Sequence, residues 1–205
     1  IDVISSVSGG SITSAYFGLH GANFKEFEDG LSKGVRSNII KKTLLSLRVA
    51  IIAIPSSFFL VFLILLLFTP YAWISSILMI FSLIILYKFQ FRLFPFSEII
   101  EKIYDKGFFV HKVLGDFNDH PHIAINSTNL ETSRPFTFSK TKMSDSKYEH
   151  PDDEKPSIKF KSNIFPIARA VAASTCVPFA FTPVGIAKEF FENESDISRA
   201  RPKLV

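Results

Sequence analysis

Ser8 is the residue whose surroundings in the sequence best suit covalent catalysis. It follows the apolar, β-branched pair Val3-Ile4 and precedes Gly9-Gly10, and the residues beyond the glycines can begin a helix. A strand, a sharp turn and a helix in this order expose a serine hydroxyl at the apex of the turn. The first N–H groups of such a helix point to the place where an oxyanion would form. The sequence therefore predicts that Ser8 is a nucleophile.

The turn around Ser8 departs from the usual nucleophile elbow at one position. The elbow pattern is G-x-S-x-G, with glycine two residues before and two residues after the serine. Here Gly10 occupies the second position, whereas Ser6 occupies the first. Because serine is small, we expect the turn to accommodate the Cβ atom of Ser6.

Three pieces of the chain, in the same order, resemble the patatin-like phospholipases. The first is the elbow, Ser6-Val7-Ser8-Gly9-Gly10-Ser11. The second, residues 123–136, resembles the family's strand and its Thr-Asp-Leu-x-Thr-Gly turn. The third, residues 168–184, begins with Ala168-Arg169-Ala170-Val171-Ala172-Ala173-Ser174 and continues through a proline turn into an apolar segment. The three pieces together are far more specific than any one of them.

The resemblance implies an α/β fold, a patatin-like three-layer α/β/α domain that is present in part, and hydrolysis of lipid esters by a Ser-Asp dyad. Ser8 would attack the ester carbonyl, an aspartate would act as its base, and the backbone N–H of Gly9 would help to hold the oxyanion. Neither a metal nor a cofactor is implied.

Two parts of the family's catalytic machinery lie outside these 205 residues. The family's aspartate belongs to an Asp-Gly-Gly or Asp-Gly-Ala motif after the Ala-Arg-Ala-Val helix, and its glycine-rich oxyanion loop precedes the elbow. We therefore expect the sequence to be an internal piece of a longer protein, and we expect that piece to be inactive by itself.

A long uncharged run separates the family-like pieces. No Asp, Glu, Lys or Arg occurs from Val49 to Tyr87, and the whole chain has a mean hydropathy of +0.27. A helix needs about 20 apolar residues to cross a bilayer, and Thr69-Pro70 interrupts the run near its middle. The sequence predicts a transmembrane hairpin over 44–92, with spans at about 49–68 and 71–87, between two parts of the enzyme domain, 1–43 and 93–205.

Basic residues flank the apolar run on both sides. Lys41 and Lys42 precede it and Lys88 and Arg92 follow it, so the positive-inside rule predicts an integral membrane protein whose enzyme domain is cytoplasmic. A re-entrant hairpin that enters the bilayer without crossing stays open, because Pro55 can kink the first span. The expected partners are the bilayer and its lipids, and the net charge of +4 gives no support for nucleic-acid binding.

The remaining patterns predict the elements that position Ser8. Helical periodicity and alternation predict helices over 9–19, 24–40 and 96–114, a strand over 122–126, a hairpin of strands 134–139 and 158–161, and a surface loop over 140–156.

Other chemistries are less well supported by the sequence. His111, His120 and His122 could suggest a Ser-His-Asp triad or a metal site, but no H-x-x-x-H pair or cysteine cluster accompanies them, and Cys176 is the only cysteine. Ser-Gly-Gly also ends the trypsin-type Gly-Asp-Ser-Gly-Gly motif, but Val7 stands where that motif has aspartate. A catalytically inactive, membrane-anchored scaffold of the same fold remains an alternative to the enzyme.

Overall fold

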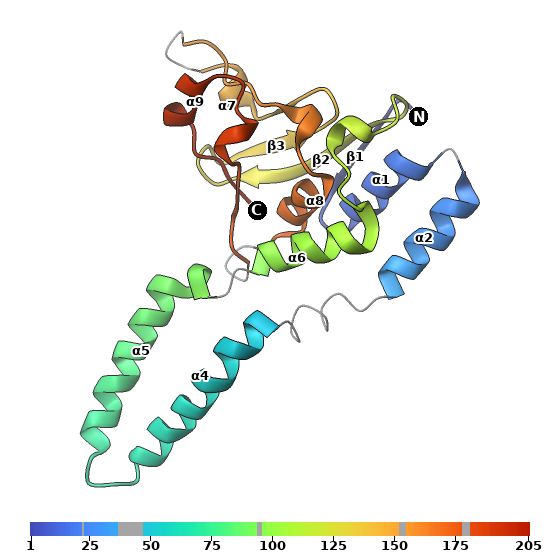
Figure 1. Cartoon of the computed structure of the whole chain (residues 1–205). Coiled ribbons are helices and arrows are strands. Elements are labelled where there is room, and N and C mark those ends of the chain that lie inside the picture. Colours follow the sequence, from blue (N-terminus) through green and yellow to red (C-terminus); the bar gives the residue numbers. More distant parts are fainter. Residues whose placement is uncertain (22, 37–46, 94–95, 152–154, 178–180) are drawn as a thin grey trace. The chain divides into compact units, whose positions relative to one another are not determined.

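The structure is a computed structural model of residues 1–205, and it describes all of them except 22, 37–46, 94–95, 152–154 and 178–180. The chain is 56% helical and 16% strand, which confirms a mixed α and β class. It divides into two compact units, of which the first comprises Ile1–Ile39 and Ser97–Val205 and the second Ile40–Phe96. The first unit is a sheet with packed helices, and the second is a pair of helices (Figure 1).

The sheet of the first unit is built around β2 (His122–Asn129). β1 (Val3–Val7) lies parallel to β2, whereas β3 (Arg134–Phe138) is antiparallel to it. The other edge of β3 pairs antiparallel with β4 (Met143–Ser144). β6 (Lys203–Leu204) pairs antiparallel with the end of β2 and also with β5 (Val184–Gly185). Because β3 occupies one edge of β2, β1 and β6 share the other edge and approach each other end to end.

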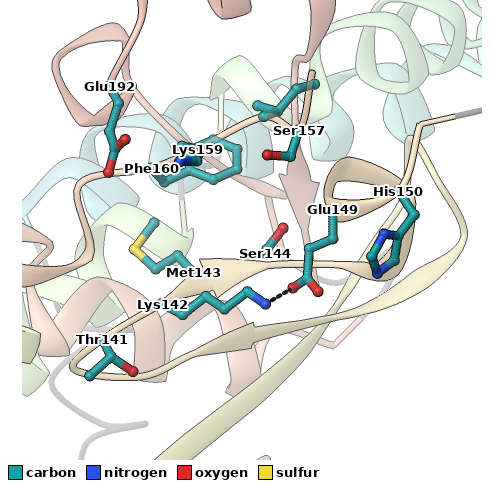
Figure 2. Close-up of a pocket in the computed structure, with 11 residues that line it drawn as sticks. Thr141, Lys142, Met143, Ser144, Glu149, His150, Ser157, Lys159, Phe160 and Glu192 are labelled. Carbon is teal, nitrogen blue, oxygen red and sulfur yellow. Dashed lines mark ion pairs between the residues drawn. The ribbon is translucent and has the colours of Figure 1, made fainter. Parts of the chain in front are cut away.

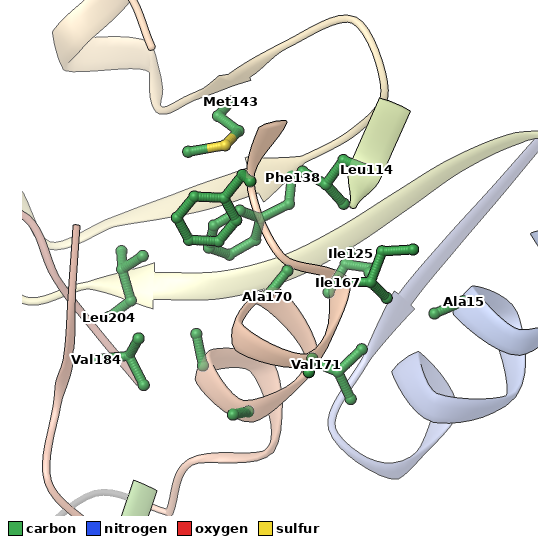
Figure 3. Packing of buried hydrophobic residues seen from close by; sticks show 14 of the residues in the cluster. Ala15, Leu114, Ile125, Phe138, Met143, Ile167, Ala170, Val171, Val184 and Leu204 are labelled. Carbon is green, nitrogen blue, oxygen red and sulfur yellow. The ribbon is translucent and has the colours of Figure 1, made fainter. Parts of the chain in front are cut away.

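Helices α1 (Gly9–His20) and α8 (Ile167–Thr175) cover the face of β2 that carries Ile123 and Ile125. A Cβ atom at Gly18 of α1 would lie 2.6 Å from Cγ1 of Ile123, so the helix approaches the sheet closely. Val171 of α8, Ala15 of α1 and Ile125 of β2 belong to the same cluster of buried side chains (Figure 3). The small residues of both helices therefore allow two helices and a sheet to pack around one core.

Phenylalanine rings fill the core between β3 and the C-terminal part of the chain. Phe138 stacks on Phe165 with a centroid distance of 5.3 Å, and Phe165 meets Phe190 edge-on at 4.8 Å. Phe136 meets Phe160 in the same manner at 5.8 Å. Burial of these large rings contributes strongly to stability, since each removes much apolar surface from water.

The connection between β2 and β3 corrects the predicted hairpin of 134–139 with 158–161. β3 pairs with β2 through the short turn 130–133, in which Ser133 has a φ of 56°. Phe160 instead forms an isolated bridge with Phe191. A short turn costs less chain entropy to close than a long connection does, which favours β2 as the partner of β3.

The predicted surface loop over 140–156 also contains regular structure. It includes β4 and the short helix α7 (Ser146–Glu149). The buried carboxylate of Asp145 caps this helix by accepting hydrogen bonds from the N–H groups of Lys147 and Tyr148, and it also accepts from the side chains of Asn129 and Thr132. Asp145 therefore attaches this segment to the end of β2.

The predicted helix 96–114 is shorter in the structure. α6 (Phe96–Tyr104) is followed by a π-helical turn, Asp105–Phe109, and then by Val110 and His111 with φ of 44° and 62°. The adjacent side chains of Phe108 and Phe109 are both buried in the core at this π turn. The chain continues through 3₁₀ turns at Leu114–Asp116, Ser162–Ile164 and Lys188–Phe190, and through α9 (Glu194–Arg199).

Within the first unit, helix α2 (Phe24–Arg36) packs closely on Tyr16 and Phe108 at two glycines. A Cβ atom at Gly30 would lie 2.0 Å from the hydroxyl oxygen of Tyr16, and one at Gly34 would lie 2.2 Å from Cε1 of Phe108. Side chains at either position would therefore force α2 away from α1 and the π turn. Gly30 thus has a packing role, although its Asp29-Gly30 context resembles a catalytic motif.

We expect Gly34→Ala to destabilise the protein by about 1–3 kcal/mol, because the new methyl group overlaps the Phe108 ring. Alanine is the better helix former by about 1 kcal/mol, so helix propensity alone predicts the opposite sign. Thermal unfolding followed by circular dichroism measures the difference. Gly107→Ala is the control, because nothing lies within 4 Å of a Cβ atom there. A Gly34→Ala protein as stable as the parent would contradict the packing.

The second unit is a helical hairpin of α4 (Leu47–Leu66) and α5 (Ala72–Leu93). The buried hydroxyl of Ser75 donates to the carbonyl of Leu63 at 2.6 Å, and the Thr69 hydroxyl donates to the carbonyl of Leu66 at 2.7 Å. These bonds connect the two helices and close the end of α4. The predicted helical pair is therefore present, with its turn at Thr69-Pro70. Over the residues with described positions, no helix combines the length and apolar character that a bilayer crossing requires, so the predicted transmembrane spans are not supported.

Candidate active site at Ser8

Ser8 lies in the turn between β1 and α1, and its backbone is left-handed. Its φ is 54° and its ψ is −135°, in a region that residues with a Cβ atom rarely adopt. Such a conformation costs of the order of 1–3 kcal/mol and persists only where surrounding contacts hold it. The side chain is exposed to solvent. The predicted strand, turn and helix therefore form, with the Ser8 hydroxyl at an accessible and strained position.

The positions on either side of Ser8 show how the turn accommodates Ser6. A Cβ atom at Gly10 would lie 4.0 Å from Cβ of Ser6, which is ordinary van der Waals contact. The Ser6 hydroxyl is hydrogen-bonded to that of Ser14, one turn further along α1. The space beside Gly9 is open, with nothing within 4 Å of a Cβ atom. The backbone at Gly9 is thus accessible to a substrate carbonyl.

The end of helix α8 holds the Ser8 amide. The N–H of Ser8 donates to the carbonyl of Ser174 at 3.2 Å and to its hydroxyl oxygen at 3.0 Å. The Ser174 hydroxyl also contacts the Ser11 hydroxyl at 2.7 Å and donates to the Asn126 carbonyl at 2.6 Å. Ser174 therefore connects the elbow, α1 and β2 through one side chain.

Asn126 connects the three strands behind the elbow. Its side-chain amide donates to the Ser5 hydroxyl at 2.9 Å and to the Ser6 carbonyl at 3.2 Å. Its side-chain carbonyl accepts from the Thr137 hydroxyl at 2.8 Å. Ser8, Asn126 and Ser174, one from each family-like piece of the sequence, therefore meet at one place. Sequence reasoning assigned no role to Asn126 or Ser174, although a serine that ends an alanine-rich helix was a visible signal.

The amides after Ser8 are available to a ligand. Among the described residues, no backbone or side-chain oxygen accepts a hydrogen bond from the N–H groups of Gly9 or Gly10. Both lie in the first turn of α1, where the helix dipole is positive and no acidic side chain is present. This arrangement can stabilise a negative charge that develops on an oxygen beside Ser8.

The described part of the chain places no carboxylate or imidazole in hydrogen-bonding contact with the Ser8 hydroxyl. β6, however, runs toward the elbow. Val205 exchanges two backbone hydrogen bonds with Thr128, at 2.6 and 3.0 Å. Because β6 is antiparallel to β2, the line of β6 points along β2 from Thr128 toward Asn126. Asn126 in turn pairs with Val7 at the end of β1.

The three histidines considered as alternative catalytic or metal-binding residues contact side chains other than Ser8. Nδ1 of His111 is 2.7 Å from the Asp105 carboxylate, and the rings of His120 and His122 are 5.1 Å apart. Lys140 lowers the pKa of nearby Asp119 by hydrogen bonding and charge. The described residues contain no group of three or more His, Cys, Asp or Glu side chains that could hold a metal ion. Burial raises the pKa of the Cys176 thiol, which disfavours the reactive thiolate.

Two surface hollows differ in their relation to Ser8. The hollow in Figure 2 lies beside β4, where Lys142 and Glu149 form an ion pair of 2.7 Å, and its lining does not include the elbow. A shallow apolar hollow of about 420 Å³ begins at the elbow itself and is lined by Ile4, Ser6, Gly10, Thr13, Ser14, Phe17 and Phe27. Only the second could hold part of a molecule that reacts at Ser8.

Comparisons of the chain with models of protein families, with curated proteins and with solved structures find no match. The resemblance to patatin-like phospholipases accordingly rests on the sequence pieces themselves.

Proposed function

We propose that this chain belongs to a serine-dependent lipid acyl hydrolase of the patatin type, with Ser8 as its nucleophile. The observation that carries the proposal is the left-handed backbone of an exposed serine at a strand-to-helix turn. The two free amides that follow it, at Gly9 and Gly10, support the same chemistry. Strained residues of this kind gather at active sites because their geometry serves the reaction.

In the proposed mechanism, the Ser8 hydroxyl oxygen attacks the ester carbonyl carbon of an acyl lipid while a base removes its proton. The amides of Gly9 and Gly10 hydrogen-bond to the resulting oxyanion. Collapse of this intermediate breaks the ester bond and releases the alcohol part of the lipid, which takes up the proton. Water then attacks the acyl-serine and releases the fatty acid, which regenerates Ser8.

The base in this proposal is an aspartate supplied by residues that follow Val205. The direction of β6 supports this assignment, because continuing the strand would bring the next residues alongside Ser127 and Asn126, close to the end of β1. An Asp-Gly-Gly or Asp-Gly-Ala sequence in that position would complete the dyad.

The proposed fold is the three-layer α/β/α domain. α1 and α8 form one helical layer, and β1 exposes Val3, Ser5 and Val7 on the opposite face. Parallel strands are normally covered on both faces. The second helical layer of the proposed fold would therefore pack on these three residues.

The proposed substrate class is a lipid, for which two apolar surfaces are suited. The hollow beside the elbow suits an acyl chain attached to the reacting carbonyl. Its lining includes Phe17 and Phe27, whose ring centroids are 5.4 Å apart. The helical hairpin is the second surface, and it suits insertion into a lipid layer.

The hairpin exposes apolar side chains on every side of its first helix except the one that packs on α5, where Leu63 is buried. The five consecutive residues from Phe58 to Phe62 have exposed fractions between 45% and 73%. Consecutive helical residues are about 100° apart, so these five residues point in directions spread around the helix axis. A partner protein with one docking face would cover only part of this surface, whereas acyl chains can surround it. We therefore propose that the hairpin holds the domain at the cytoplasmic side of a membrane, with Lys88 near the lipid headgroups.

The test of the proposed activity is to express the intact parent protein and its Ser8→Ala variant in membranes and to profile the fatty acids released from each lipid class. Loss of release in the variant supports the proposal. Equal release from both proteins would remove Ser8 from the mechanism and favour the inactive-scaffold alternative.

A further inference from the structure

We propose that Ser174 is a positioning residue for the nucleophile: its carbonyl and hydroxyl together hold the Ser8 backbone in the left-handed conformation that catalysis requires. This inference rests on the proposed role of Ser8. The two acceptors of Ser174 lie 3.2 and 3.0 Å from the Ser8 nitrogen. Both hydrogen bonds are thus made by Ser8 itself, the residue with the strained backbone, and not by one of its neighbours.

The hydroxyl of Ser174 is suited to this role because all of its hydrogen-bonding capacity is used. It accepts from the Ser8 N–H and from the Ser11 hydroxyl, and it donates to the Asn126 carbonyl at 2.6 Å. The two flanking partners orient the oxygen toward the Ser8 N–H. Ser11 is fully buried, and the side chain of Asn126 is itself bonded to Ser5, Ser6 and Thr137. The hydroxyl oxygen of Ser174 is therefore held by groups that are themselves fixed by burial or by hydrogen bonds.

The support behind Ser174 is a rigid helix. Residues 170–173 of α8 are buried at 2% exposure or less. Just before them, the Nε–H of Arg169 is shared between the two carboxylate oxygens of Glu101 in α6, at 3.0 and 3.1 Å. The position of Ser174 is therefore determined by the core of the domain, and the core thereby determines the backbone of Ser8.

The binding of the Ser8 amide has a second consequence for the site. It directs the Ser8 N–H into the protein, toward α8, and away from solvent. The amides of Gly9 and Gly10 then remain as the oxyanion donors. Ser174 in this way sets both the direction of the Ser8 hydroxyl and the identity of the amides that face the substrate.

The test compares Ser174→Ala, Ser174→Thr and Ser8→Ala in the intact parent protein, with kcat and KM measured for hydrolysis of a phospholipid in mixed micelles. We expect Ser174→Ala to lower kcat by about 10- to 100-fold, as small misplacements of a reacting group do, with KM changed less than about twofold. Ser174→Thr keeps the hydroxyl and should restore most of kcat. Thr175→Ala is the matched control, because the Thr175 hydroxyl bonds to Val171 of its own helix.

The outcomes separate the positioning role from the proposed function. Full activity of Ser8→Ala would overturn the proposed function and this inference with it. An inactive Ser8→Ala protein together with a Ser174→Ala protein of unchanged kcat would overturn the positioning role alone. A loss of kcat that matches a large fall in melting temperature would also overturn it, because Ser174 would then act only in folding. Labelling of Ser8 by a fluorophosphonate, slower in Ser174→Ala at a temperature where both proteins are folded, supports positioning.

Discussion

Replacement of Ser8 by alanine in the intact parent protein is expected to lower kcat/KM for lipid ester hydrolysis by at least about 10³-fold. Loss of a serine nucleophile removes the covalent step, and only binding and oxyanion stabilisation remain to accelerate attack by water. The fold should survive the change, because the Ser8 side chain is exposed and the structure assigns its hydroxyl no hydrogen bond among the described residues. Release of radiolabelled fatty acid from vesicles measures the effect.

The matched control for this experiment is Ser198→Ala. Ser198 is an exposed serine on α9 whose hydroxyl donates to the carbonyl of Ser195 in its own helix. Its removal should leave kcat/KM unchanged. A Ser8→Ala protein with more than a tenth of the parent activity would contradict a nucleophilic role for Ser8, provided that the Ser198→Ala protein behaves as the parent does.

Introducing aspartate at both Phe58 and Phe81 is expected to abolish binding of the chain to lipid vesicles. Their side chains are 73% and 59% exposed. Each lies roughly 12–14 Å along its helix from the hairpin turn, within the part of the hairpin that is proposed to enter the apolar layer. An aspartate at that depth costs about 2.5–3.5 kcal/mol, so each substitution should weaken partitioning about 100-fold.

Sedimentation of the 205-residue chain with phosphatidylcholine vesicles that contain an anionic lipid measures this binding. Phe24→Asp is the control, because Phe24 is 66% exposed but belongs to α2, outside the hairpin. It should sediment as the parent chain does. Equal sedimentation of the Phe58→Asp, Phe81→Asp double variant would show that the apolar hairpin binds something other than the interior of a lipid layer.

The elements that depend on nearby residues were predictable from the sequence. β-branched residues followed by glycines define the strand, turn and helix around Ser8, and Pro70 defines the turn of the helical hairpin. In both places the local backbone preference and the apolar pattern agree, so no distant contact is needed to choose between structures. The alternation in 122–126 likewise predicted β2, although the strand extends further, to Asn129.

The elements that depend on distant residues were not predictable. Phe108 and Phe109 both enter the core, and their packing ends α6 in a π turn. Phe160 forms an isolated bridge with Phe191 in place of the predicted pairing of 158–161 with β3, and this bridge depends on how the C-terminal part of the chain packs. The closeness of α2 to Tyr16 and Phe108, which requires glycine at 30 and 34, appears only when the helices are packed together.

The same division holds for the candidate site. The sequence by itself determined that an exposed serine would stand between a strand and a helix, because residue types within a few positions of Ser8 decide that local structure. Only the tertiary structure decided what holds the left-handed backbone of Ser8, since its partner, Ser174, lies 166 residues away in the chain. Hydrogen bonds of this kind depend on where the core places α8 and β2, and no local pattern contains that information.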